Sequence, residues 1–374
     1  MRHCASQFLP LIFFVVLIAG CAAPSAASSP QVAATATMVP YPTATPTPIT
    51  ISQTPLTEQQ AWGNVHDVQF PSAFGARLFN LTTSAVTDDD QVCGVLRPAS
   101  FDVTSTETVT LMNLHTGQLT QIHQLPTGYQ EIGCVATGDW LIWMEGYGDT
   151  VGSLHSQLSI VAFNRQTQEM RQLDQGSSAN GQSPQGAVLL VPSASNGYVT
   201  WTTIVDAQGD TDAVLYNLAT QHKTTLAQHA DHPALSWPWA AWDDGVQKGV
   251  VFKNLQTNQQ ILFAQEPGPW SLNSSAFVTQ DANATMITLY PALSNMSRSE
   301  IIGQSINGDF VQDPYVNDRL VTWDSNDTLF AFDRKLQRLV QIPVQGNPLP
   351  LISSHYFIWG DKTSWHVLDT NALP

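Results

Sequence analysis

Imidazole and carboxylate side chains gather at one place in the sequence, in a short polar stretch and at the end of the next apolar run. They are His229, Asp231, His232, Asp243 and Asp244. Both types of side chain bind divalent cations, and two histidines three positions apart fit a metal or ligand site. No cysteine or third histidine completes a ligand set. A solvated loop is therefore the alternative, and no other cofactor is expected.

Tryptophan is the second residue type with a chemical use, because an exposed indole can stack on a sugar ring. Five of the eleven occupy one repeated position near the end of an apolar run, where we expect them to fill the space between neighbouring sheets: Trp143, Trp201, Trp242, Trp323 and Trp359. Three others lie outside that register or near loops, and they are the candidates for stacking on a sugar: Trp237, Trp239 and Trp270.

Standard catalytic signatures are absent from the sequence. It contains no G-x-S-x-G, no H-E-x-x-H and no phosphate-binding loop. A pair of carboxylates brought together from distant positions could still act as in a glycosidase. The net charge of −16 argues against a nucleic-acid partner, which needs clustered Lys and Arg.

The N-terminus carries an apolar run from Phe8 to Ile18, too short to span a membrane comfortably and typical of a signal peptide. Its end, Ile18-Ala-Gly-Cys21, resembles the cleavage signal of bacterial lipoproteins (the lipobox). The resemblance implies that residues 1–20 are a signal peptide and that Cys21 carries fatty acyl chains such as palmitate. The protein would then be anchored to the cell membrane or envelope, facing outside the cytoplasm. The alternative is an ordinary secretory signal cleaved near Ala22 or Ala23.

Residues 21–60 are predicted to be a disordered linker. The stretch 22–57 contains no charged residue and is rich in Ala, Thr, Ser and Pro. Such a chain cannot bury a core, and in an extended polyproline conformation its 36 residues would reach up to roughly 110 Å. This composition is typical of a tether that holds a folded domain, residues 61–374, away from the lipid.

Cys93 and Cys134 are the only cysteines in the expected folded domain. Export would permit a disulfide between them. Two buried free thiols are the alternative, because cysteine often serves as a small core residue.

Residues 61–374 repeat one pattern. Short apolar runs alternate with Gly, Asn, Asp and Ser turns, which is typical of an all-β protein. Runs such as Gly138–Trp143, Asn196–Trp201 and Asp318–Trp323 share one frame, and each is followed by an alternating strand such as Leu158–Arg165. We divide each copy into four strands, A, B (with the Trp), C and D. Seven copies in 314 residues give about 45 residues each, the period of propeller blades.

This pattern resembles the TolB-like and WD40-like β-propellers of exported bacterial proteins. The resemblance implies an all-β ring of seven four-stranded blades, with six or eight blades as alternatives. It brings no catalytic residues, and such propellers more often bind or scaffold than catalyse. The last copy ends after its C strand, near Asp369. Because a propeller must close to remove free sheet edges, a strand from residues 62–82 is predicted to complete the last blade.

Charged residues are predicted to separate between the two ends of the blades. The B–C turns are acidic, with Glu145, Asp149, Asp206, Asp210, Asp212, Asp243, Asp244, Asp281, Asp324, Asp327 and Asp361, offset only by Lys248 and Lys362. The C–D turns carry Arg165, Lys223, Arg298, Arg334 and Lys335. One negative face would attract divalent cations or a basic partner. The alternative is that Asp merely favours turns.

The sequence therefore indicates a surface-anchored lipoprotein whose propeller is a binding or protein-interaction module. Its partner, a protein or a glycan, is not specified by the sequence. The alternative is a carbohydrate-active enzyme of the cell envelope with carboxylates at the central channel, and a third interpretation is a purely structural part of the envelope.

Overall fold

A computed structural model describes residues 38–39, 49–50, 54–81, 86–148, 156–176, 192–205, 210–264, 268–293, 296, 298–305, 310–326, 328–344, 350–361 and 363–374. All described residues belong to one compact unit, Ala36–Pro374. The predicted signal peptide, Cys21 and part of the predicted linker lie outside them. No helix among the described residues is long and apolar enough to cross a membrane.

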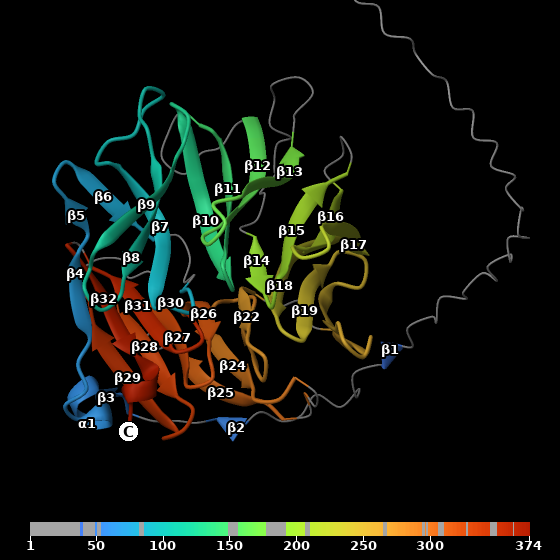
Figure 1. Cartoon of the computed structure of the whole chain (residues 1–374). Helices are drawn as coiled ribbons and strands as arrows, with labels where there is room; N and C mark the ends of the chain where they lie inside the picture. Colours follow the sequence, from blue (N-terminus) through green and yellow to red (C-terminus); the bar gives the residue numbers. More distant parts are fainter. Residues whose placement is uncertain are drawn as a thin grey trace, which may run out of the picture. The chain divides into compact units, whose positions relative to one another are not determined.

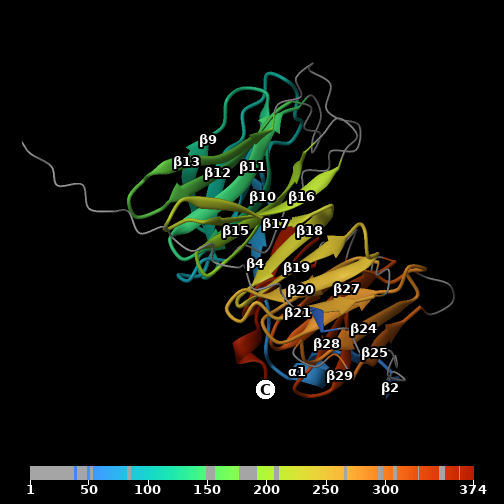
Figure 2. The ribbon, with the colours of Figure 1, turned by 90° about the vertical axis from the view of Figure 1, so that its right-hand side faces the viewer.

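Seven antiparallel four-stranded sheets follow one another along the chain, each in the order A-B-C-D (Figures 1 and 2). The first sheet consists of β6 (Arg77–Asn80), β7 (Gln91–Pro98), β8 (Thr108–Asn113) and β9 (Leu119–Gln124), with β5 (Ala73–Phe74) beside β6. The second sheet consists of β10 (Tyr129–Thr137), β11 (Trp140–Tyr147), β12 (Ser156–Asn164) and β13 (Met170–Gly176). The third and fourth consist of β14 (Ser193–Ser195), β15 (Tyr198–Ile204), β16 (Thr211–Asn217) and β17 (His222–Gln228), and of β18 (Ala230–Ser236), β19 (Trp239–Asp244), β20 (Gly249–Asn254) and β21 (Gln260–Phe263). The fifth and sixth consist of β22 (Trp270–Leu272), β23 (Phe277–Gln280), β24 (Met286–Tyr290) and β25 (Glu300–Gln304), and of β26 (Gln312–Val316), β27 (Leu320–Ser325), β28 (Thr328–Asp333) and β29 (Arg338–Pro343). The seventh consists of β30 (Leu351–Ile352), β31 (Tyr356–Gly360), β32 (Ser364–Asp369) and β4 (Val68–Pro71), and a 3-10 turn, Thr370–Ala372, follows β32.

The sheets form a ring, which confirms the predicted seven-bladed propeller. The A strands of successive blades contact one another, β10 with β14, β14 with β18, β18 with β22, β22 with β26 and β26 with β30. The A strands therefore surround the centre of the ring, and the D strands lie at its outside. In this topology the A–B and C–D turns lie at one end of every blade, and the B–C turns lie at the other.

The repeated tryptophans pack between neighbouring blades, as predicted. Trp143, Trp201 and Trp323 are at most 2% exposed. Trp201, for example, lies in one apolar cluster with Ile142 and Met144 of the preceding blade. The fifth blade has no Trp in its B strand, and there Phe277 packs against Phe252 and Phe263 of the preceding blade. Burying a large aromatic side chain at each junction supplies several kcal/mol per blade pair, so the spacing of the aromatics along the chain sets the spacing of the blades.

The N-terminal strand β4 closes the ring, as predicted for residues 62–82. It pairs antiparallel with β32, with Val68 opposite Val367 and Phe70 opposite Trp365. Figure 1 shows β4 beside β32, although the two strands come from opposite ends of the folded domain. The indole of Trp365 donates to the main-chain oxygen of Phe79 at 3.0 Å, which joins the seventh blade to the first.

A histidine fixes the closing strand at its outer end. His366 of β32 contacts Asp67 through Nδ1 at 2.6 Å and Asp361 through Nε2 at 3.0 Å. Its ring stacks on Trp359, and its side chain is 15% exposed. The hydrogen bond that His366 donates to Asp67 raises the pKa of His366 despite partial burial, and Asp361 acts in the same direction. Burial favours a higher pKa for Asp361, but hydrogen bonds from His366 and from the Thr363 and Ser364 amides lower it to about 2.

Stability is therefore expected to fall as the pH rises above about 6.5. A raised histidine pKa gives stabilisation that is complete below the unfolded value of 6.5 and is lost as the pH rises through the folded value. Glu58, whose pKa is raised by burial and by Asp67, acts in the same sense, and His66 also faces this group. We expect the free energy of unfolding to be larger for wild type than for His366→Gln. This difference should be greater at pH 5.5 than at pH 9 by on the order of 1 kcal/mol, as measured by denaturant unfolding. A difference that stays constant over this range would contradict the ion-pair role. The exposed His222 provides a control, His222→Gln.

Three short strands lie where the linker was predicted to be disordered. β1 (Met38–Val39), β2 (Ile49–Thr50) and β3 (Leu56–Thr57) pair in parallel with β21, β25 and β29, the D strands of blades four, five and six. These are small apolar or β-branched islands in the Pro-, Ala- and Thr-rich tract, and a D strand offers each of them unpaired main-chain groups. The chain thus follows the outside of the ring towards β4.

The helix α1 (Glu58–Trp62) then leads into the closing strand. Thr57 caps its first turn, and its Trp62 is buried, with the indole donating to Asp333 at 3.1 Å. Asp333 is fully buried and also binds Arg319 through both carboxylate oxygens at 2.9 Å. Arg319 in turn donates to the main-chain oxygen of Pro374. Both ends of the folded domain are thereby held on the sixth blade.

Cys93 and Cys134 form a disulfide, so of the two alternatives the disulfide is correct and the pair of free thiols is not. Cys93 lies in β7 and Cys134 in β10, so the bond joins the first and second blades. Both residues are fully buried among Leu111, Leu141 and Trp143.

The predicted separation of charge between the two faces is wrong. The described carboxylates of the predicted set do follow B strands or precede C strands. Other acidic groups lie at the opposite end, in or beside the A–B and C–D turns: Asp88, Asp90, Asp139, Asp318 and Asp333. Arg77 and Arg97, at the start of β6 and near the end of β7, place basic groups at the B–C end. Asp is used in turns of both kinds, so turn chemistry outweighs any division by face. Asp149, Asp206, Asp327 and Lys362 lie outside the described residues.

Candidate functional site

A cavity of about 870 Å³ opens where the A strands of the seven blades meet their A–B turns. Every blade contributes to its wall. The lining residues with polar or aromatic side chains are Asp88, Thr137, Asp139, Trp140, Ser193, Ser195, Asn196, Ser236, Trp237, Asn273, Ser274, Asn317, Asp318, Ser353 and Ser354. No Lys, Arg or His occurs among the described lining residues. The cavity is therefore large, polar and acidic.

The A–B turns present these side chains because most of them are short: in blades two, three, four, six and seven they reverse the chain in two or three residues. In the second and third blades Gly138, Asn196 and Gly197 adopt left-handed backbone conformations, which Gly and Asn accept at low cost. The side chains beside them, such as Asp139 and Ser195, then point away from the apolar strand faces. Because the A–B connections lie at the same end of every blade, their polar groups meet at the cavity.

Three carboxylates reach the cavity from blades one, two and six. Asp139 Oδ1 accepts from the Gln166 amide at 3.0 Å, and Asp318 Oδ1 accepts from the Asn273 amide at 2.8 Å. Asp88 is exposed and has no side-chain partner in the described part of the chain. Neutral amide donors leave the negative charge of these groups in place.

Two indoles line the same cavity. The ring of Trp237, at the A–B turn of the fourth blade, stacks on Tyr198 with 5.2 Å between centroids. Trp140, in the second blade, has the guanidinium carbon of Arg171 4.5 Å from its ring centroid. Of the three tryptophans predicted to stack on a sugar, Trp237 alone lies at the cavity. Trp239 is 6% exposed in the core between blades four and five, and the Trp270 indole donates to Asp243 at 2.8 Å.

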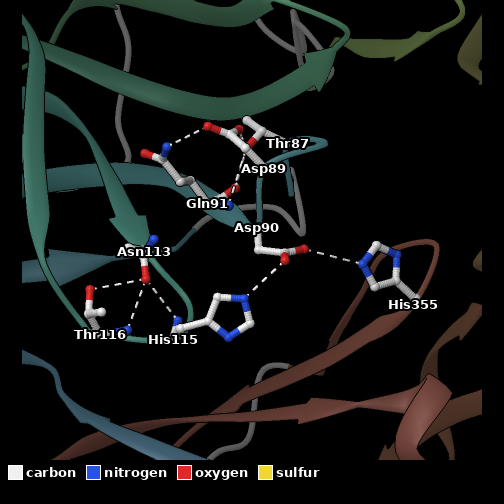
Figure 3. Close-up of polar contacts among 8 residues, drawn as sticks. All are labelled: Thr87, Asp89, Asp90, Gln91, Asn113, His115, Thr116 and His355. Atoms are coloured by element: carbon white, nitrogen blue, oxygen red, sulfur yellow. Dashed lines mark hydrogen bonds and ion pairs between the residues drawn. The ribbon is translucent and has the colours of Figure 1, made fainter.

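A histidine–carboxylate cluster adjoins the cavity at the junction of the first and seventh blades (Figure 3). Asp90 lies between two imidazoles, His115 Nε2 at 3.0 Å and His355 Nε2 at 3.4 Å. The hydrogen bond from His115 lowers the pKa of Asp90 despite some burial, and Tyr356 and His355 contribute to this shift. Ser354, which lines the cavity, has its hydroxyl 2.9 Å from His355 Nδ1.

Backbone geometry explains how Asp90 reaches both histidines. Asp90 has a positive φ of 56°, a conformation that Asp tolerates better than most residues. Its main-chain oxygen accepts from the Leu114 amide, which fixes the C–D turn of the same blade, and Asn113 caps that turn. The hydroxyl, imidazole and carboxylate thus follow one another in the order of a nucleophile, a base and an orienting group.

The histidine and aspartate cluster of blade four lies at the opposite end of the ring. Asp231 is opposite Asp243 and Ala230 opposite Asp244 in the register of β18 and β19, so these residues come together as expected. His232 Nδ1 is 3.1 Å from Asp243 Oδ2, whereas His229 pairs with Asp210 at 3.7 Å. The hydrogen bond with Asp243 raises the pKa of His232. The described residues contain no group of three or more side chains arranged to hold a metal ion.

Sequence reasoning missed the Asp90 cluster and all cavity residues other than Trp237. Most residues of the A–B turns are Gly, Asn, Ser or Asp, which turns of every kind favour. Asp90 and His355 are 265 positions apart and meet only because the ring closes. The one usable signal was the repeated position of the turns, since side chains at equivalent turns of a propeller converge at its centre.

Comparisons with known proteins support the fold. No protein-family model matches the chain, and no curated protein does. Among solved structures, an oligogalacturonate lyase from Vibrio parahaemolyticus is similar at 10% identity with a TM-score of 0.53, over 83% of this chain and 95% of the lyase. A prolyl endopeptidase is similar at 11% identity with a TM-score of 0.53, and a Pyrococcus horikoshii acylaminoacyl peptidase at 7% with a TM-score of 0.52. Their alignments cover 82% and 84% of this chain but 49% and 52% of theirs, so the chain spans about half the length of these peptidases. At such identities the likeness shows the β-propeller fold alone.

Proposed function

We propose that the protein is an exported lipoprotein, anchored through Cys21, whose propeller is a binding module with its site in the central cavity. The cavity carries this proposal, because residues from all seven blades build one polar pocket with two indoles. A pocket of this size, with a few convergent polar groups, is the usual form of a ligand site. The TolB-like pattern of the strands and the lipobox-like sequence that ends at Cys21 support a location at the outside of the cell membrane.

The anchor gives the first test of this proposal. Replacing Cys21 by Ser removes the thiol that would carry the lipid, so the protein is expected to leave the membrane fraction or to accumulate unprocessed. Fractionation followed by N-terminal sequencing measures both outcomes. Cys4→Ser, which lies in the predicted signal, is the matched control and is expected to fractionate like wild type. Unchanged fractionation of Cys21→Ser, with a mature N-terminus other than Cys21, would contradict the anchor.

The cavity gives a second and independent test. The full-length protein would be used to capture partners from membrane extracts and to probe a glycan array. Trp237→Ala changes the cavity wall and leaves the blade cores in place, so it is expected to reduce capture or glycan binding. Val246→Ala, at the exposed B–C turn of the same blade, is the control. Equal capture by wild type and Trp237→Ala would remove the cavity from the proposal.

A carbohydrate-active enzyme is the second candidate function. The observation that favours it is the presence of three carboxylates and two indoles in one cavity, beside the Ser354–His355–Asp90 contacts. Carboxylates of this kind can serve as general acid and base for glycoside cleavage. The similar lyase is named for oligogalacturonate, which is an anionic polymer. The described cavity lining offers no cation to bind such a chain, so a neutral or cationic glycan suits this cavity better.

Product formation separates the two candidates. Incubation of the purified full-length protein with neutral, cationic and anionic oligosaccharides, followed by measurement of chain shortening, would show an enzyme. Asp139→Asn and Asp90→Asn would then be expected to reduce turnover. Binding without any shortened product would favour the binding module.

A further inference from the structure

The charge of the central cavity indicates what it binds. Its wall carries three carboxylates, from Asp88, Asp139 and Asp318, and no basic side chain among the described lining residues. Arg334 interacts electrostatically with Asp318, but its Nη1 donates to the main-chain oxygen of Asn317 at 2.6 Å. The whole chain has a net charge of −16. A cation is therefore attracted over a distance and meets carboxylates that form no salt bridge within the described part of the chain.

The indoles of the cavity add a second, independent feature. An indole face attracts ammonium and guanidinium groups. Trp140 already shows this preference, because the guanidinium carbon of Arg171, which is not among the lining residues, lies 4.5 Å from its ring centroid. Trp237 is held at the cavity because its ring stacks on Tyr198. Among the described residues, no cationic side chain lies over the other face of the Trp237 indole.

Hydrogen-bonding groups complete the cavity. Ser193, Ser195, Ser236 and Ser274, with their hydroxyls, and Asn196 and Asn273, with their amides, also line the cavity. Ammonium and guanidinium groups donate three and five hydrogen bonds, and charged donors bind most strongly to carboxylates. The volume of about 870 Å³ admits an extended chain with more than one such group.

We infer that the central cavity binds an aliphatic amine or guanidinium cation, carried by a polyamine or by Lys and Arg side chains of a peptide. This inference rests on the proposed function, because it assigns a ligand class to the same cavity. The two sources share their recognition chemistry. The acidic lining disfavours anionic polymers, and neutral sugars are the alternative that the experiment tests.

Calorimetric titration of the full-length protein in detergent tests the inference. The probes are spermidine, a tetra-lysine peptide, the same peptide with acetylated side chains, and cellotetraose. We expect 1:1 binding of spermidine, of tetra-lysine or of both, weakening as salt rises, and no binding of the two neutral probes. Tighter binding of tetra-lysine points to a protein segment as the natural ligand, and tighter binding of spermidine points to a free polyamine.

Paired variants test whether cations bind at the cavity end of strand β26. Asp318 follows β26 at the cavity, whereas Asp313 lies near the other end of the same strand. We expect Asp318→Asn and Asp139→Asn each to weaken cation binding about tenfold. Asp313→Asn should leave binding unchanged. Asp318 is exposed and Asn keeps the acceptor that Asn273 uses, so these variants are expected to fold, and the melting temperature checks this.

The outcomes separate this inference from the proposed function. Equal weakening by Asp313→Asn, or an absence of cation binding, overturns the cationic ligand. Binding of cellotetraose that Trp237→Ala abolishes would also overturn it, while leaving the cavity as a binding site. Failure of every probe, together with unchanged partner capture by the Trp237 variant, would overturn both.

Discussion

Deleting residues 65–72 is expected to prevent the propeller from folding into a closed ring. The deletion removes β4 and leaves the edge of β32 unpaired. It also removes Phe70, which is 6% exposed and packs with Trp365, and it removes Asp67, the partner of His366. Together these losses approach the 5–15 kcal/mol that stabilises a typical domain. Loss of the cooperative unfolding transition, and rapid proteolysis across the described blades, would be the measured result.

Point variants make the same test in graded form. Phe70→Ala is expected to cost about 3–5 kcal/mol of unfolding free energy, as is usual for a buried aromatic. Val68 lies in the same strand but is 47% exposed, so Val68→Ala is the matched control and should cost less than about 1 kcal/mol. Similar costs for the two variants would show that β4 does not pack as described.

Removing the disulfide should have the second-largest effect. Cys93 and Cys134 are 41 positions apart, and closing a loop of that length in the unfolded chain corresponds to about 4 kcal/mol. The double variant Cys93→Ala/Cys134→Ala is therefore expected to lose about 3–5 kcal/mol in denaturant unfolding. The bond joins blades one and two, so the loss should appear first as proteolytic cleavage near those blades.

Reductant provides the control for this prediction. Wild type that has been unfolded, reduced and alkylated should show the loss of the double variant, and the double variant itself should not respond to reductant. A loss below about 1 kcal/mol in both comparisons would mean that the bond contributes little to stability.

The strand pattern of this protein could be predicted because it rests on local chemistry. A Trp recurs in the B strands of five of the seven blades, Gly, Asn and Asp mark the turns, and the last copy lacks a D strand that residues 62–82 can supply. Those signals predict the four-stranded blades, the number of blades and the closure of the ring by an N-terminal strand. Trp237 was also found as a candidate, since it stands outside the repeated register.

Other features depend on contacts that no local signal reports. Asp90, His115 and His355 meet only across the closing junction. β1 to β3 are two-residue strands in a tract whose composition is typical of disorder, and their pairing depends on D strands that the sequence does not connect to them. The charge separation failed because Asp was assigned to faces by turn type, while Asp serves turns at both ends of a blade.

The strands β1, β2 and β3 have a consequence for self-association. A D strand with a free outer edge is a template on which another chain can add a strand. In blades four to six the protein covers that edge with its own N-terminal segment, whereas β9, β13, β17 and β4 are outermost in their sheets among the described residues. A fragment that begins at residue 61 would therefore expose seven outer edges in place of four. Such a fragment is expected to associate edge to edge at concentrations where the full chain stays monomeric.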